Sequence, residues 1–183
     1  MKAPERNETR WQPVEILHAL FHGVMLSLLC AISYWLITRM LAHVYSISRD
    51  DDLLGGMWAV AATVFVYRYS YDGSIGAALS RMGATSLSFV LCFIYLLFFP
   101  FRLSGMVTLI GVGAVVMCLL DQPDEIVTTG ITTAVVMVVA GISPNQAWKQ
   151  PILRLVDTIV GVAVGTFGTW ISLKSRRQRD IKN

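Results

Sequence analysis

Two short stretches of this chain place an arginine four residues before a threonine, inside otherwise apolar sequence. The first reads LSRMGATSLS and contains Arg81 and Thr85, and the second reads LRLVDTIVGV and contains Arg154 and Thr158. On a helix, residues i and i+4 lie on one face, so each guanidinium would have a hydroxyl one turn further on. A guanidinium stays charged at physiological pH and binds a carboxylate through two parallel hydrogen bonds. The spacing therefore indicates a site for an organic anion.

The position of these arginines in their helices matters to that hypothesis. We expect each at the first turn of a membrane span, where backbone N–H groups and the helix dipole add positive charge. A competing interpretation is that both arginines extend to the lipid phosphates. Arg154 could also form a local ion pair with Asp157 at i+3. Asp157 is in turn a candidate for proton coupling, because a carboxylate within a membrane span is costly and usually functional.

A second polar pattern lies in the first apolar run. His18 and His22 are four residues apart on one helical face, with Glu15 one turn earlier. This spacing suits a proton relay or metal ligands, but with no further ligand in view we interpret it as a polar stripe facing the bundle interior. The histidines join Asp157 as proton-coupling candidates, and no metal site is predicted.

Enzyme chemistry has no support in the sequence. The chain shows no nucleophile–base pair and no Gly-x-x-x-x-Gly-Lys phosphate loop, so we expect no catalytic residues and no cofactor. Pumping by such a chain would draw on an ion gradient rather than on ATP. The small net charge of +3 likewise gives no indication of nucleic-acid binding.

The composition determines the class of protein that carries these residues. Of 183 residues, 55% are hydrophobic and 15% are charged, against about 25% charged in an average soluble domain. Several runs of about 18 residues or more carry almost no charge, which is typical of transmembrane helices. The sequence therefore predicts an all-α integral membrane protein in the lipid bilayer. The predicted spans are 14–38, 53–69, 83–99, 103–120, 126–142 and 152–173.

The six spans give a simple domain plan. It consists of a cytoplasmic N-terminal segment (1–13), a six-span transmembrane domain (14–173) and a basic cytoplasmic tail (174–183). With the N-terminus inside, Lys and Arg are more frequent in the inside segments, mainly because of the tail. We interpret the tail as an anchor beside anionic lipid rather than a nucleic-acid arm. Full crossing by the fourth and fifth spans is an assumption of this topology.

The two arginine motifs also suggest an internal repeat. Arg81-x-x-x-Thr85 and Arg154-x-x-x-Thr158 each belong to the last span of a three-span block. Related blocks of three spans would be inverted in the membrane, a plan common among transporters, although so short a match could arise by chance. Gly161-x-x-x-Gly165 allows close helix packing, either at a dimer seam or within one chain.

In their order and spacing, these residues resemble a known family. Trp58-Ala59 with Thr63, then Arg81-x-Gly-x-Thr85, then Arg154-Leu-Val-Asp-Thr158-x-x-Gly161 look like the membrane module of the fusaric acid resistance, or aromatic acid exporter, family. Plant aluminium-activated malate transporters are similar. One departure is that the family's Gly-Thr pair is Ala84-Thr85 here, with the glycine at position 83.

The resemblance implies an exporter or channel for organic anions such as aromatic carboxylic acids, with Arg81, Thr85, Arg154, Thr158 and Trp58 at the substrate. Many relatives carry two membrane modules, so one module implies a homodimer. The resemblance further implies a bacterial inner membrane and a periplasmic adaptor protein as a partner, while the Lys and Arg distribution predicts that both termini are cytoplasmic. The alternative is a structural or accessory membrane protein that transports nothing.

Overall fold

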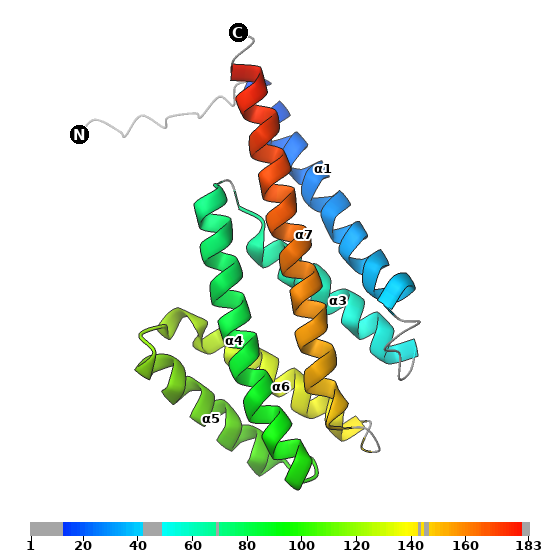
Figure 1. The fold of residues 1–183 in the computed structure, drawn as a ribbon, viewed down its shortest axis with the longest axis vertical. Coiled ribbons are helices and arrows are strands. Elements are labelled where there is room, and N and C mark those ends of the chain that lie inside the picture. Colours follow the sequence, from blue (N-terminus) through cyan, green and yellow to red (C-terminus); the bar gives the residue numbers. More distant parts are fainter. Residues whose placement is uncertain (1–12, 42–48, 69, 143, 145–146, 181–183) are drawn as a thin grey trace, which may run out of the picture.

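The computed structural model describes residues 13–41, 49–68, 70–142, 144 and 147–180, and it is helical throughout its long elements (Figure 1). In chain order these are α1 (Pro13–Trp35), η1 (Leu36–Leu41), α3 (Arg49–Val66), α4 (Tyr71–Phe98), α5 (Leu103–Leu119), η2 (Pro123–Glu125), α6 (Ile126–Ile142) and α7 (Lys149–Asp180). The six predicted spans correspond one by one to the six α-helices, and the prediction of an all-α membrane protein is confirmed.

Within the described residues, four helical segments are long and apolar enough to cross a bilayer: Ala19–Met40, Asp72–Phe98, Pro123–Ile142 and Lys149–Lys174. The α5 helix is apolar but shorter. The α3 helix is not one of these four segments, and its first turn carries three acids, which the positive end of the helix dipole stabilises. Large apolar side chains on the outside of the bundle, such as Leu20 and Phe98, are exposed in a way that suits contact with lipid tails.

One predicted boundary is wrong. The α4 helix begins at Tyr71 rather than near residue 83, and the Ser70 side chain caps it by accepting a hydrogen bond from the Gly73 backbone N–H at 3.1 Å. Its first turns look like a loop in sequence because they are rich in Gly and Ser. They are helical because Ser74 and Ala78 are buried on the same face as Arg81. Arg81 therefore lies about three turns inside α4, not at its first turn.

The helices form two related halves. In one half, α1 and α7 both pack on α3. In the other half, α5 and α4 pack on α6 in the same way. The two halves meet where α4 and α7 pack on each other. A half-turn of Figure 1 about the viewing direction brings α1, α3 and α4 approximately onto α5, α6 and α7, with matching chain directions. This is the arrangement of two inverted three-helix repeats, which the paired arginine motifs predicted.

The central helix α7 is packed differently from its counterpart α4. A Cβ atom at Gly161 would collide with the Ala59 carbonyl oxygen, and one at Gly165 would lie 2.9 Å from the Thr63 carbonyl oxygen. These glycines therefore let α7 approach the backbone of α3 within one chain. The alternative use of Gly161 and Gly165 as a dimer seam is wrong.

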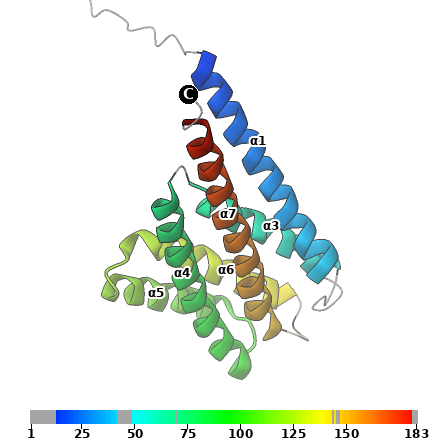
Figure 2. The ribbon, with the colours of Figure 1, turned by 45° about the horizontal axis from the view of Figure 1, so that its top comes forward.

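In the opposite half, α4 and α6 contact each other through their side chains. Ser88 of α4 donates a hydrogen bond to the Thr129 carbonyl oxygen of α6 at 3.0 Å, and a buried apolar cluster continues the interface towards the end of α4. That cluster consists of Cys92, Leu96, Val136, Met137 and Ala140. In Figures 1 and 2, the start of α1 and the end of α7 lie at the same end of the molecule.

Candidate functional site

The first arginine, Arg81, is buried between two helices. Its side chain is 6% exposed, and its guanidinium Cζ lies 5.6 Å from the Trp58 ring centroid and 4.7 Å from that of Phe65. Trp58 and Phe65 are seven residues apart and so share one face of α3. Aromatic faces attract a cation, which holds this guanidinium in place without neutralising it.

Polar groups around Arg81 lack partners. Among the residues that the structure describes, no carboxylate lies within ion-pair distance of Arg81, and its Nε has no hydrogen-bond acceptor. The Thr85 hydroxyl, one turn further along α4, and the indole N–H of Trp58 are also buried without a partner. Buried donors without acceptors are rare and costly, so this group of residues has unused capacity to bind a polar molecule.

One acid lies near enough to influence Arg81 without contacting it. Glu125, at the end of η2, attracts Arg81 electrostatically. The Glu125 carboxylate accepts a hydrogen bond from the Ser80 hydroxyl, which ties η2 to α4. The positive charge of Arg81 is therefore moderated at a distance, while its guanidinium stays open to a closer anion.

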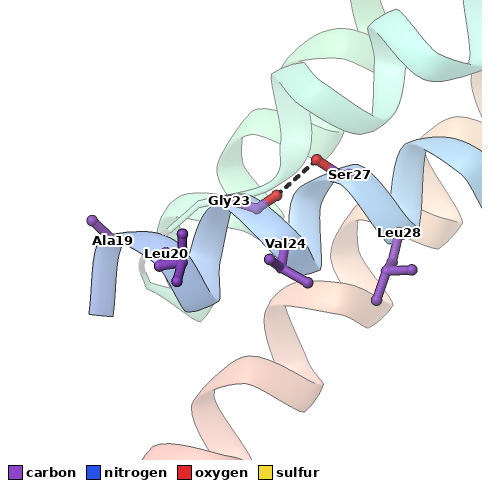
Figure 3. Close-up of a pocket in the computed structure, with 6 residues that line it drawn as sticks. All are labelled: Ala19, Leu20, Gly23, Val24, Ser27 and Leu28. Carbon is purple, nitrogen blue, oxygen red and sulfur yellow. Dashed lines mark hydrogen bonds between the residues drawn. The ribbon is translucent and has the colours of Figure 1, made fainter. Parts of the chain in front are cut away.

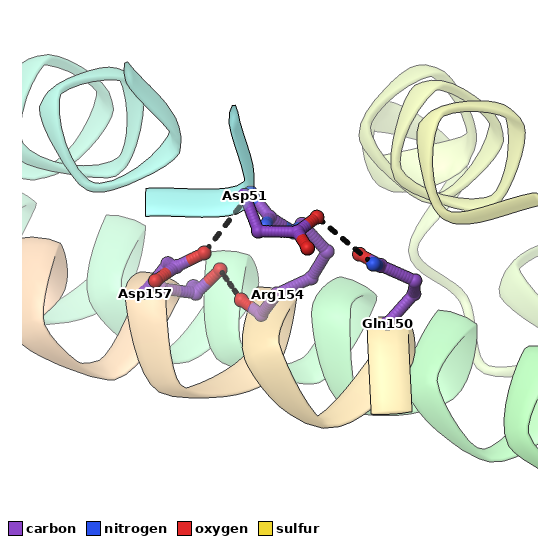
Figure 4. Close-up of polar contacts among 5 residues, drawn as sticks. Asp51, Gln150, Arg154 and Asp157 are labelled. Atoms are coloured by element: carbon purple, nitrogen blue, oxygen red, sulfur yellow. Dashed lines mark hydrogen bonds and ion pairs between the residues drawn. The ribbon is translucent and has the colours of Figure 1, made fainter. Parts of the chain in front are cut away.

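The second arginine, Arg154, is surrounded by charged and polar side chains. It is 1% exposed, and its Nη1 lies 3.0 Å from the Asp157 Oδ2 atom, one turn further along α7 (Figure 4). The Thr158 hydroxyl donates to the Arg154 carbonyl oxygen at 2.8 Å and is thereby used within the helix. The predicted i+3 ion pair is confirmed.

Two further groups from α3 and α7 complete a buried cluster around Arg154. The Gln150 Nε2 atom donates a hydrogen bond to the Asp51 Oδ1 atom at 3.0 Å, and both side chains are buried. A Cβ atom at Gly55 would lie 2.9 Å from the Asp157 Oδ1 atom, so only glycine lets this carboxylate rest against α3. We call Asp51, Gln150, Arg154 and Asp157 the acid–arginine cluster.

Most of the chain, including both arginine motifs, matches the sequence model of a described protein family. The sequence model of the fusaric acid resistance protein-like family matches residues 32–168, about three quarters of the chain. The chain belongs to the fusaric acid resistance protein-like family. No curated protein and no solved structure is significantly similar to it. The region shared with the family contains both arginines, both threonines and Trp58, and it leaves out most of α1 and the basic tail.

In this member of the family, the structure places the predicted residues in two separate groups. Arg81, Thr85 and Trp58 lie together between α3 and α4, whereas Arg154, Thr158 and Asp157 lie between α3 and α7. Neither arginine is at a first turn or extended towards lipid phosphates, so both of those expectations are wrong. Packing of α3 against both helices encloses the arginines instead.

The histidine pattern has a different outcome. The buried His22 Nδ1 atom lies 2.7 Å from the Tyr67 hydroxyl, and Phe21 packs edge-on against its ring at 5.8 Å between centroids. His22 thus faces the bundle, between α1 and the end of α3. The side chain of His18 lies outside the described residues.

Three residues of these groups were missed from the sequence. Asp51 resembled part of a solvated acidic loop, Gln150 part of a connection between spans, and Phe65 one apolar residue among many. Each becomes significant only when α3 packs against α4 and α7. One local feature could have indicated the role of Asp51. It directly precedes an apolar run, a position typical of the first turn of a helix as well as of a loop.

Two shallow grooves lie away from both arginines. One runs along the outer face of α1, past Gly23 and Ser27, where the Ser27 hydroxyl donates to the Gly23 carbonyl oxygen at 2.9 Å (Figure 3). The other is on α7 beside Phe167 and Trp170. Both are open and lined mainly by apolar side chains, which suits lipid contact better than an anion path.

Proposed function

We propose that this family member is a membrane transport protein, an exporter or channel, for organic anions such as aromatic carboxylic acids. The observation that carries the proposal is the buried Arg81 guanidinium, which stacks on Trp58 and Phe65 and has no carboxylate within ion-pair distance in the described part of the chain. Membership of a family described by resistance to an organic acid supports the same class of function.

The chemistry of the Arg81 group fits an aromatic carboxylate. Its guanidinium can form two parallel hydrogen bonds to the carboxylate, and the Thr85 hydroxyl can donate a third from the same helix face. The ring of the ligand can then lie against Trp58 or Phe65, where offset or edge-on contacts between aromatic groups are favourable. The group thus offers one element of recognition for each part of the ligand.

The second arginine has a different proposed role in the same path. Arg154 already contacts Asp157, so an arriving anion would have to compete with an internal carboxylate. Arg154 is therefore proposed to receive the anion only after it leaves Arg81, while the Thr158 hydroxyl beside it keeps its hydrogen bond within α7. Asp157 and His22 are the proposed proton-coupling residues that the structure describes.

The proposed setting follows the sequence arguments. It is a bacterial inner membrane, with both ends of the chain in the cytoplasm and a homodimer as the assembly. A periplasmic adaptor protein is the proposed partner for export. The excess of Lys and Arg in the inside segments supports this orientation.

The test is flux of radiolabelled phthalate, an impermeant aromatic dicarboxylate, into liposomes that contain the purified protein. Arg81→Ala should lower the flux about 30-fold, since losing one buried charged contact costs about 2 kcal/mol or more. Phe65→Ala should lower it about fivefold, from the loss of roughly 1 kcal/mol of cation–π and ring contact. Arg102→Ala is the matched control, because Arg102 is an exposed arginine outside the group.

The result also separates the two functional classes. Flux that is equal in the wild type and Arg81→Ala would remove the role of this arginine. A folded wild-type protein that carries no phthalate or benzoate would instead favour the accessory membrane protein.

A further inference from the structure

Three buried donors on one face of α4 have no hydrogen-bond partner among the residues that the structure describes. They are the Ser74 hydroxyl, the Arg81 Nε–H and the Thr85 hydroxyl. The Ser74 side chain is 0% exposed and that of Thr85 is 1% exposed. Ser74 comes seven residues before Arg81 and Thr85 four residues after it, and both spacings keep side chains on one face of a helix. We call these three residues the α4 polar row.

Other buried hydroxyls of the bundle show how such groups are ordinarily used. Ser88, on the same helix, donates to the Thr129 carbonyl oxygen at 3.0 Å, and Thr158 donates to the carbonyl oxygen four residues earlier in α7. Both are common uses of a hydroxyl in a helix. The hydroxyls of Ser74 and Thr85 have neither, and a buried hydroxyl that bonds nothing is costly. The α4 polar row can therefore bind a polar group from outside the chain.

The row occupies the half of α4 that is nearer to the start of this helix. Ser74 is in the first turn of α4, and Thr85 is near its middle. Towards the other end, Cys92 and Leu96 belong to the apolar cluster shared with α6. In Figure 1, α4 begins towards the same end of the molecule at which α7 ends. In the proposed orientation that end is cytoplasmic, so the row suits the entry of an anion that is to be exported.

The second repeat has no equivalent row. Aligning Arg81 with Arg154 places Ala147 opposite Ser74, so the first hydroxyl is missing. The residue opposite Thr85 is Thr158, whose hydroxyl is bonded within α7. If these hydroxyls served only the packing of the repeated fold, both repeats would be expected to carry them. They accompany instead the arginine that stacks on aromatic rings.

The nearby acid lies beside the row rather than in it. Glu125 attracts Arg81, but its carboxylate accepts a hydrogen bond from Ser80. Consecutive residues are about 100° apart around a helix, so Ser80 and Arg81 face different directions. The hydrogen bond thus keeps this carboxylate to one side of the row.

We propose that Ser74 contacts the transported anion before Arg81 does, and that the anion moves along the α4 polar row from Ser74 to Arg81 and Thr85. A hydroxyl donates one hydrogen bond to a carboxylate, whereas a guanidinium donates two in parallel. The anion is therefore held more weakly at Ser74 than at Arg81, which favours its movement inwards. This inference rests on the proposed anion transport and assigns the route by which the anion reaches Arg81.

The first test needs no substrate. Ser74→Cys is made in a chain whose three native cysteines are replaced by alanine, and its reaction with an anionic and a cationic methanethiosulfonate reagent is followed by mass spectrometry. Ser74→Cys should react with the anionic reagent faster than Ser88→Cys, which is the control on the same helix. Adding Arg81→Gln should slow the anionic reagent about tenfold and not the cationic one, because a positive charge attracts only the anion.

Two results of this test would overturn the proposal. One is a reaction at position 74 that is no faster than at position 88, since the row would then be closed to anions. The other is a reaction that the Arg81→Gln change leaves equally fast, since Arg81 would then have no influence on anions at Ser74.

The second test measures phthalate flux in liposomes. Ser74→Ala should lower the flux about fivefold, the effect of losing one hydrogen bond to the anion. Ser88→Ala should carry phthalate as the wild type does, because Ser88 is equally buried but its hydroxyl is already bonded to α6. Equal flux in Ser74→Ala and the wild type, with the loss in Arg81→Ala retained, would overturn the role of Ser74 and leave anion transport standing. Absence of flux in the wild type would remove the transport function itself, and the cysteine reaction would still decide whether anions reach the row.

Discussion

Arg81 and Arg154 occupy equivalent places in the two repeats, yet among the described residues only Arg154 of the two has a carboxylate within ion-pair distance. The difference is one residue: aligning the motifs places Ala84 opposite Asp157. In the first repeat the arginine stacks on two aromatic rings, whereas in the second it lies 3.0 Å from the Asp157 carboxylate and is also attracted by Asp51. We therefore propose the first arginine of the paired motifs for an external anion, whereas the second is paired with a carboxylate of its own helix.

The last helices of the two repeats, α4 and α7, also differ in how they pack on the other repeat. Glycines bring α7 onto the backbone of α3, while Ser88 and the buried cluster hold α4 against α6 through side chains. The two arginines therefore belong to helices that pack differently, since glycines hold α7 against the α3 backbone and side chains hold α4 against α6.

The largest expected effect comes from removing the arginine that is neutralised. Arg154→Ala leaves Asp157 buried without its partner, which should lower the free energy of unfolding by about 3–5 kcal/mol. Unfolding by sodium dodecyl sulfate titration in mixed micelles measures this. The double variant Arg154→Ala with Asp157→Ala should recover much of the loss, because the carboxylate that Arg154 contacts is removed with it. If the single and double variants are equally unstable, the ion pair is not what distinguishes the second arginine.

The next prediction converts the first arginine into the second. Ala84→Asp places a carboxylate at i+3 from Arg81, as Asp157 is from Arg154, and should lower phthalate flux about 30-fold by competing for the guanidinium. Ala84 is fully buried, so the similarly sized but uncharged Ala84→Asn is the control for crowding. Flux in the liposome assay should survive in Ala84→Asn. Equal losses in both variants would mean that packing, not charge, is responsible.

The sequence predicted the helices and the repeats better than it predicted the contacts of individual side chains. Apolar runs indicated six helices, and the paired motifs indicated two repeats, because hydrophobic length and residue spacing are local properties. The sequence could not place Arg81 in the interior of α4, since residues 70–80 read as a turn until Ser74 and Ala78 are seen to be buried. It also could not connect Asp51 with Gln150, which are 99 positions apart. Such pairs depend on how α3 packs against α7.

The smallest expected effect distinguishes the two threonines. Thr158 already donates to the Arg154 carbonyl oxygen, whereas the Thr85 hydroxyl is buried without a partner. Replacing Thr by Val keeps the shape and removes the hydroxyl. Thr85→Val should raise the phthalate concentration for half-maximal flux about fivefold, the value of one hydrogen bond of roughly 1 kcal/mol. Thr158→Val should leave that concentration unchanged, because its hydroxyl bonds only its own helix. An equal response of the two variants would mean that the repeats share the anion, and that the contrast between the two arginines does not extend to their neighbours.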